Sequence, residues 1–111
     1  MKREVCDALY HFCIPANLTG HSYIAEAVAI CLDNPAAIYN MADIYEAIGE
    51  SAGKKTCNVE RSIRYAIQYA CKHLPPEQLS SFVNPRLHTG KPANSLFLAQ
   101  LTEWIRMQAD E

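Results

Sequence analysis

An apolar stripe at helical spacing runs through residues 57–74 and constrains the fold more than any other feature of the sequence. Val59, Ile63, Ile67 and Leu74 recur at intervals of four or seven residues, which places them on one face of an α-helix. Polar and charged side chains occupy most positions between them. Because one apolar face has to be buried against other elements, the stripe predicts a bundle of packed helices.

Other segments show the same periodicity, and none shows the strict alternation of a half-buried strand. We expect about six helices, over residues 3–13, 22–33, 36–49, 57–74, 76–83 and from 94 to the C-terminus. The last of them is expected to start after Asn94, which is a suitable N-cap. Pro15 and Gly20 are expected to separate the first two helices, and Ile67 and Trp104 are expected in the core. Length and the absence of repeats indicate one all-α domain over residues 1–111, a compact bundle containing a helix-turn-helix.

The sequence gives no indication of export, a membrane span, a metal site or catalysis. There is no run of apolar residues long enough for a span and no apolar signal-peptide core, so we expect a cytoplasmic protein. Five cysteines are typical of free thiols in such a chain. Cys6, His11 and Cys13 lack the paired close spacing of structural zinc sites. No carboxylate pair, nucleophile pair or phosphate loop stands out, and we expect neither an enzyme nor a cofactor.

The net charge of −2 hides an uneven distribution along the chain. Residues 1–53 carry two basic and seven acidic side chains, for a net charge of −5. Residues 54–92 carry seven basic and two acidic side chains, for a net charge of +5, and residues 93–111 have a net charge of −2. A basic segment within an acidic chain is typical of a protein that binds a polyanion, although surface lysines also serve solubility.

Two predicted helices joined by the turn "GESAGKK" match a helix-turn-helix over about residues 36–74. In that motif the early turns of the second helix meet base edges in the major groove, where Arg pairs with guanine, Asn with adenine and Glu with the cytosine amino group. Basic side chains in the turn and in the later loop would contact phosphates. The candidate DNA-binding residues are Asn58, Glu60, Arg61, Arg64, Tyr65, Lys54, Lys55, Arg86, His88 and Lys91. The alternative is that these are solvated charges on an ordinary amphipathic helix.

Three blocks of the sequence resemble one known family. "NVERSIRYAIQYA" (58–70) resembles the recognition helix of the C-terminal effector domain in the stage-zero sporulation protein A family, a response regulator that controls sporulation. "KPANSLFLAQLTEWIR" (91–106) is similar to the Lys-Pro-Thr-Asn-Ser-Glu-Phe-Ile segment and last helix of that family. "IPANLTGHSYIAEAV" (14–28) is similar to its Val-Pro-Ala-His-Ile-Lys-Gly-Tyr stretch. The blocks occur in the family's order and spacing.

The resemblance implies a sequence-specific DNA-binding transcription regulator. Glu60, Arg61 and Arg64 fall on the Glu, Arg and Arg of the family's recognition helix, whereas Asn58 falls where the family usually has Arg. The partners it implies are double-stranded DNA, bound as tandem domains or a homodimer, and the sigma subunit of RNA polymerase. Residues 71–85 depart from the family stretch implicated in the sigma contact.

A second interpretation also follows from the sequence. In the family this domain comes after a receiver domain, and here the chain begins at Met1, which leaves a stand-alone relative or a fragment cut from a longer regulator. The second interpretation is a receiver-less protein-interaction module that pairs with a full-length regulator or RNA polymerase and binds DNA weakly. Asn58 and the acidic total charge favour this alternative.

Overall fold

The described part of the chain consists of helices joined by short connections, and it contains no strand. The computed structural model describes residues 2–75, 77 and 93–109. Its elements are α1 (Lys2–His11), α2 (Thr19–Asp33), the 3₁₀ helix η1 (Pro35–Tyr39), α3 (Met41–Ala52), α4 (Thr56–His73) and α6 (Asn94–Ala109). The expected all-α fold is therefore confirmed for these residues. The helix expected over 76–83 lies outside them, apart from Glu77.

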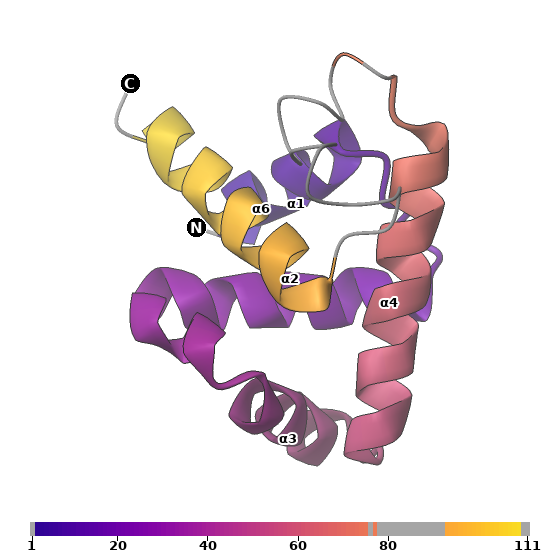
Figure 1. The fold of residues 1–111 in the computed structure, drawn as a ribbon, viewed down its shortest axis with the longest axis vertical. Helices are drawn as coiled ribbons and strands as arrows, with labels where there is room; N and C mark the ends of the chain where they lie inside the picture. Colours follow the sequence, from indigo (N-terminus) through magenta and orange to yellow (C-terminus); the bar gives the residue numbers. More distant parts are fainter. Residues whose placement is uncertain (1, 76, 78–92, 110–111) are drawn as a thin grey trace.

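The helices pack around α2, which crosses the middle of the molecule (Figure 1). Helices α1 and α6 lie on one side of α2, and α3 lies on the other. Helix α4 runs along one edge and contacts α2, α3 and α6. One long helix thus touches both halves of the bundle, so its outer face has a fixed orientation relative to the rest of the molecule.

The apolar stripe of α4 is buried, as its spacing predicts. Val59, Ile63 and Ile67 are at most 1% exposed and pack in one cluster with Ile24 of α2 and Phe97 of α6. Full burial of an aliphatic or aromatic side chain of this size contributes about 1.5–3 kcal/mol relative to an exposed one. This contact fixes which face of α4 is left for solvent.

Trp104 of α6 was expected in the core, and this expectation is only partly right. Its side chain is half-buried, with the indole stacked on His11 at a ring-centroid distance of 5.0 Å and meeting the edge of Phe12 at 5.2 Å. The ring therefore covers the end of α1 at the surface instead of filling the interior.

Gly20 was expected to break the chain between two helices, and this prediction is wrong. It lies inside the first turn of α2 and is buried. A Cβ atom there would stand 2.7 Å from the Cβ of Ala66 and would also collide with the backbone carbonyl of Ser62 in α4. Glycine is present because α2 and α4 cross in close contact, and the preceding helix ends instead at His11, where Cys13 adopts a left-handed conformation with φ of 63°.

The helix expected over 36–49 is divided into two elements. Pro35 begins η1, which ends before Asn40, and α3 follows from Met41. Asn40 has φ of −136° and ψ of 70°, outside the helical region, and its amide donates to a carboxylate oxygen of Asp43 at 2.7 Å. Asn40 thus separates the two elements and directly precedes the first residue of α3.

Candidate nucleic-acid interface

A tight turn of three residues joins α3 to α4. Gly53 has φ of 68°, a left-handed conformation that favours glycine. The backbone N–H groups of Gly53 and Lys54 both donate to the carbonyl of Gly49. A Cβ at Gly49 would lie 2.6 Å from the carbonyl oxygen of Lys54, so this close turn requires glycine there as well. The two glycines fix the angle at which α4 leaves α3.

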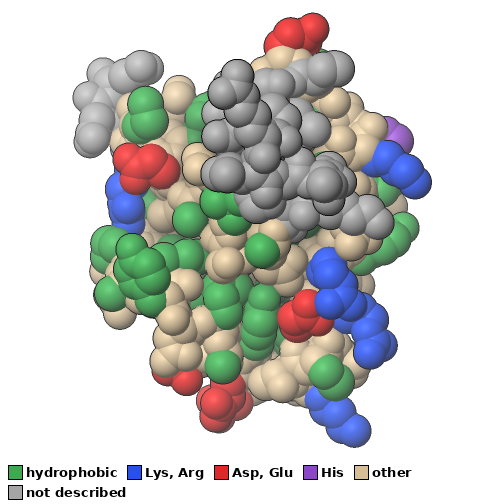
Figure 2. All heavy atoms as spheres, viewed as in Figure 1, with side chains coloured by type: hydrophobic (Ala, Val, Ile, Leu, Met, Phe, Trp, Pro, Cys, Tyr) green, Lys and Arg blue, Asp and Glu red, His purple; other side chains and the backbone are tan. Residues whose placement is uncertain are grey.

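The polar residues of α4 form an exposed face opposite the core. Asn58, Arg61, Tyr65 and Lys72 are exposed, and at 100° per residue they fall within a sector of about 60° on the helix. In Figure 1, α4 forms one edge of the molecule. Figure 2, in the same view, shows Lys and Arg side chains along that edge. We call these four residues the outer face of α4.

Glu60 and Arg64 lie on the flank of α4, beside the outer face. A guanidinium nitrogen of Arg64 donates to a carboxylate oxygen of Glu60 at 2.6 Å, and the two side chains are 48% and 33% exposed. A partly exposed pair four residues apart on a helix contributes only a few tenths of a kcal/mol to stability. In the structure it directs the Arg64 guanidinium toward Glu60. Arg61, by contrast, has no hydrogen bond or ion pair with any residue that the structure describes.

Lys54 and Lys55 are exposed at the N-terminal end of α4, where Lys55 precedes the first helical residue. Positive side chains at the positive end of a helix dipole do not stabilise the helix, but they add to a local field that attracts anions. Arg86, His88 and Lys91, the other three predicted contacts, lie outside the described residues.

Two residues of this region were not among the predicted site residues. Tyr45 of α3 and Asn94 of α6 meet beside Glu60, where the Asn94 amide donates to the Tyr45 hydroxyl at 3.0 Å. Burial raises the pKa of the Tyr45 hydroxyl above its ordinary value, and the bond from Asn94 partly opposes this. Both residues lie in segments that the sequence predicts as helices. Their contact leaves no trace in the helical periodicity, because they are 49 positions apart in the sequence.

The described residues contain no group of three or more His, Cys, Asp or Glu side chains that could hold a metal ion. Nor does any of the described helices have the length and apolar character needed to cross a membrane. The chemistry of this surface is that of exposed basic and amide side chains.

The comparison with protein families gives the class of the protein. Residues 5–105 match the model described as the sporulation initiation factor Spo0A C terminal. The chain belongs to this family. The Spo0A C-terminal domain is a DNA-binding regulatory domain and not an enzyme, so the protein is a DNA-binding regulator of the sporulation type. The expected family is thereby confirmed.

Proposed function

We propose that this member of the Spo0A C-terminal family recognises a specific duplex sequence by placing α4 in the major groove, with α3 and α4 acting as a helix-turn-helix. The observation that carries the proposal is the outer face of α4, where Asn58 and Arg61 stand exposed on the first turns after a tight turn. The second helix of such a motif reads bases with its N-terminal residues.

The side chains have distinct proposed roles. Arg61, which has no protein partner among the described residues, donates to the O6 and N7 acceptors of guanine. Asn58 offers one donor and one acceptor, which suits the N6 and N7 edge of adenine. Arg64, paired with Glu60, contacts a base or phosphate from the flank of the helix. Tyr65 packs against the sugar-phosphate backbone of the DNA.

Phosphate contacts complete the proposed interface. Lys54 and Lys55 contact the backbone beside the start of α4, and we assign Arg86, His88 and Lys91 to the backbone on the other side. Tandem or dimeric binding and a contact with the sigma subunit rest on the family resemblance alone.

The test is binding to duplex DNA with Arg61→Ala and a matched control, Arg3→Ala. Both variants lose one exposed positive charge, but Arg3 lies on α1 and not on α4. A lost base contact should cost about 1–3 kcal/mol on the selected sequence, with unchanged circular dichroism, while Arg3→Ala should bind like wild type. Equal binding by Arg61→Ala and wild type would show that the outer face does not read DNA.

The alternative function, a protein-interaction module that pairs with a full-length regulator or RNA polymerase, has one structural observation in its favour. Tyr10 of α1 and Tyr39 of η1 are 86% and 89% exposed, and exposed aromatic rings are enriched in protein interfaces. A salt titration distinguishes the two functions. A DNA-binding protein loses affinity with a log–log slope of about −0.9 per neutralised phosphate, whereas weak binding with a shallow slope favours the interaction module.

A further inference from the structure

Asn94, the first residue of α6, is buried and polar. It is 9% exposed, and the described residues contain one other buried polar side chain, Thr102 of the same helix. The Thr102 hydroxyl donates to the carbonyl of Leu98 within α6, at 2.7 Å. The amide of Asn94 instead reaches two other helices, and this makes it unusual.

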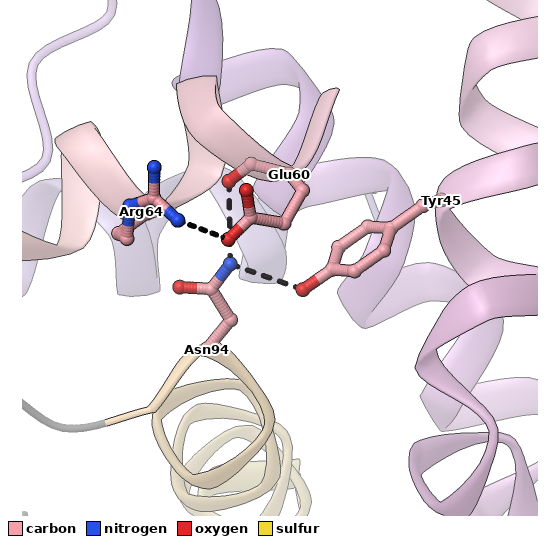
Figure 3. A network of polar contacts seen from close by, with 4 residues as sticks. All are labelled: Tyr45, Glu60, Arg64 and Asn94. Carbon is pink, nitrogen blue, oxygen red and sulfur yellow. Dashed lines mark hydrogen bonds and ion pairs between the residues drawn. The ribbon is translucent and has the colours of Figure 1, made fainter. Parts of the chain in front are cut away.

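The amide nitrogen of Asn94 makes two hydrogen bonds. It donates to the hydroxyl of Tyr45 in α3 at 3.0 Å and to the backbone carbonyl of Glu60 in α4 at 3.3 Å (Figure 3). A side-chain amide nitrogen carries two hydrogens, so both are used. The donor group of one side chain therefore connects three helices.

The hydrogen bond from Asn94 to α4 is made at Glu60, the residue that also pairs with Arg64. The carboxylate of Glu60 holds Arg64, and the backbone carbonyl of Glu60 accepts from Asn94 (Figure 3). Asn94, Tyr45, Glu60 and Arg64 all line one surface cleft between α3, α4 and α6. A rotation of α4 about its axis would move Arg64 and lengthen the bond from Asn94 together.

We propose that Asn94 is a positioning residue for DNA recognition, which fixes the rotation of α4 relative to α3 and thereby the direction in which Arg64 and the outer face meet the duplex. The inference rests on the proposed function. Apolar packing against α2 decides which face of α4 is buried, but it is less sensitive to small rotations than hydrogen bonds, which weaken steeply when their angle changes. Base recognition requires side chains held within about 0.5 Å of their productive position, so a directional contact beside the reading residues governs selectivity.

The competing explanation is that Asn94 only attaches α6 to the bundle. In that case its loss lowers stability, but the protein that remains folded selects DNA as before. The discriminating quantity is the ratio of affinities for a selected duplex and a random duplex, measured well below the melting temperature. A purely structural role leaves this ratio unchanged.

The experiment uses Asn94→Asp, which keeps the shape of the side chain and replaces the donating amide with acceptors. Thr102→Val is the matched control, because it removes a buried polar group from the same helix that has no bond to α3 or α4. We expect Asn94→Asp to reduce the affinity ratio by between about fivefold and about 100-fold, the range of one lost base contact. The added negative charge weakens binding to both duplexes alike, so it cancels in the ratio. Thr102→Val should keep the wild-type ratio.

Tyr45→Phe is the second variant, and it decides the matter if Asn94→Asp does not fold. It deletes one hydroxyl and should lower the ratio in the same direction by less. An unchanged ratio in folded Asn94→Asp, or in Tyr45→Phe where the first variant is unfolded, would overturn the inference and leave the proposed function intact. A wild type that selects no sequence would overturn the proposed function and the inference with it.

Discussion

Helix α4 is held to its neighbours by two contrasting junctions. The crossing with α2 consists of apolar side chains and a close backbone approach at Gly20, while the junction at Glu60 consists of hydrogen bonds from Asn94. The crossing removes a large apolar area from water and supplies stability. The Asn94 junction removes little apolar area from water, but the strength of its hydrogen bonds depends on their direction. With the proposed role of Asn94, the stability of this helix and its fine rotation depend on different residues.

Ile67→Ala should have the largest effect, because it breaks the apolar crossing. Ile67 is 1% exposed, and its truncation leaves a cavity that should lower the free energy of unfolding by about 2–5 kcal/mol in urea denaturation. Selectivity for DNA should persist in the folded fraction. Tyr65→Ala, on the exposed side of the same helix, is the control and should change stability by less than about 0.5 kcal/mol.

Gly20→Ala tests the close approach at the same crossing. In an exposed helix this change stabilises by up to about 1 kcal/mol, because alanine is the better helix former. Here the added methyl group meets the backbone of Ser62 and the side chain of Ala66, so we expect a net loss of about 1–3 kcal/mol in thermal or urea unfolding. A stabilised variant would show that α2 and α4 do not touch at this point.

Asn58→Arg examines a residue that belongs to neither junction. Asn58 is exposed at the start of α4, so the free energy of unfolding should stay within about 0.5 kcal/mol of wild type. Restoring the usual family residue should raise affinity for a guanine-containing site by about 1–3 kcal/mol if its two donors pair with O6 and N7. Binding-site selection on both proteins measures this, and selection of the same base by both would exclude Asn58 from base reading.

Tyr45→Phe at high pH should show the smallest effect, at the Asn94 junction. Burial raises the pKa of Tyr45, so the folded protein keeps this proton after the unfolded chain has lost it. The resulting loss of stability is absent below about pH 10, the ordinary tyrosine value, and grows as pH rises through the folded pKa. Urea midpoints across this range should fall less steeply for Tyr45→Phe than for wild type, whereas Tyr10→Phe, which changes an exposed ring, should follow wild type.

The sequence predicts the crossing far better than it predicts the Asn94 junction. The stripe of Ile63 and Ile67 has a period that only a buried helix face explains, and both residues are buried. Gly20 was misinterpreted because a helix breaker and a close-contact glycine look alike until the opposing helix is known. Asn94 was expected only as an N-cap, whereas it is the first residue of α6. Its contacts could not be predicted, since its partners lie 34 and 49 positions away.

Some features of the candidate site are likewise predictable from the sequence, and others are not. Local spacing and the family resemblance place Asn58, Arg61 and Arg64 on one helix, and their exposure agrees with that placement. The pairing of Arg64 with Glu60 follows from a spacing of four residues, but the sequence does not tell whether Glu60 faces a base or a neighbouring guanidinium. That choice depends on side-chain geometry.

The glycine turn between α3 and α4 has a consequence for the thermodynamics of binding. Ordering a flexible residue costs about 1–2 kcal/mol of backbone entropy, and a loose linker would incur that cost only when the duplex is bound. Here the left-handed Gly53 and the shared carbonyl of Gly49 order the turn during folding. We therefore expect the two helices to meet the duplex as a rigid body. Exchange of the Gly53 and Lys54 amide hydrogens, which are bonded to Gly49, should be equally slow with and without DNA.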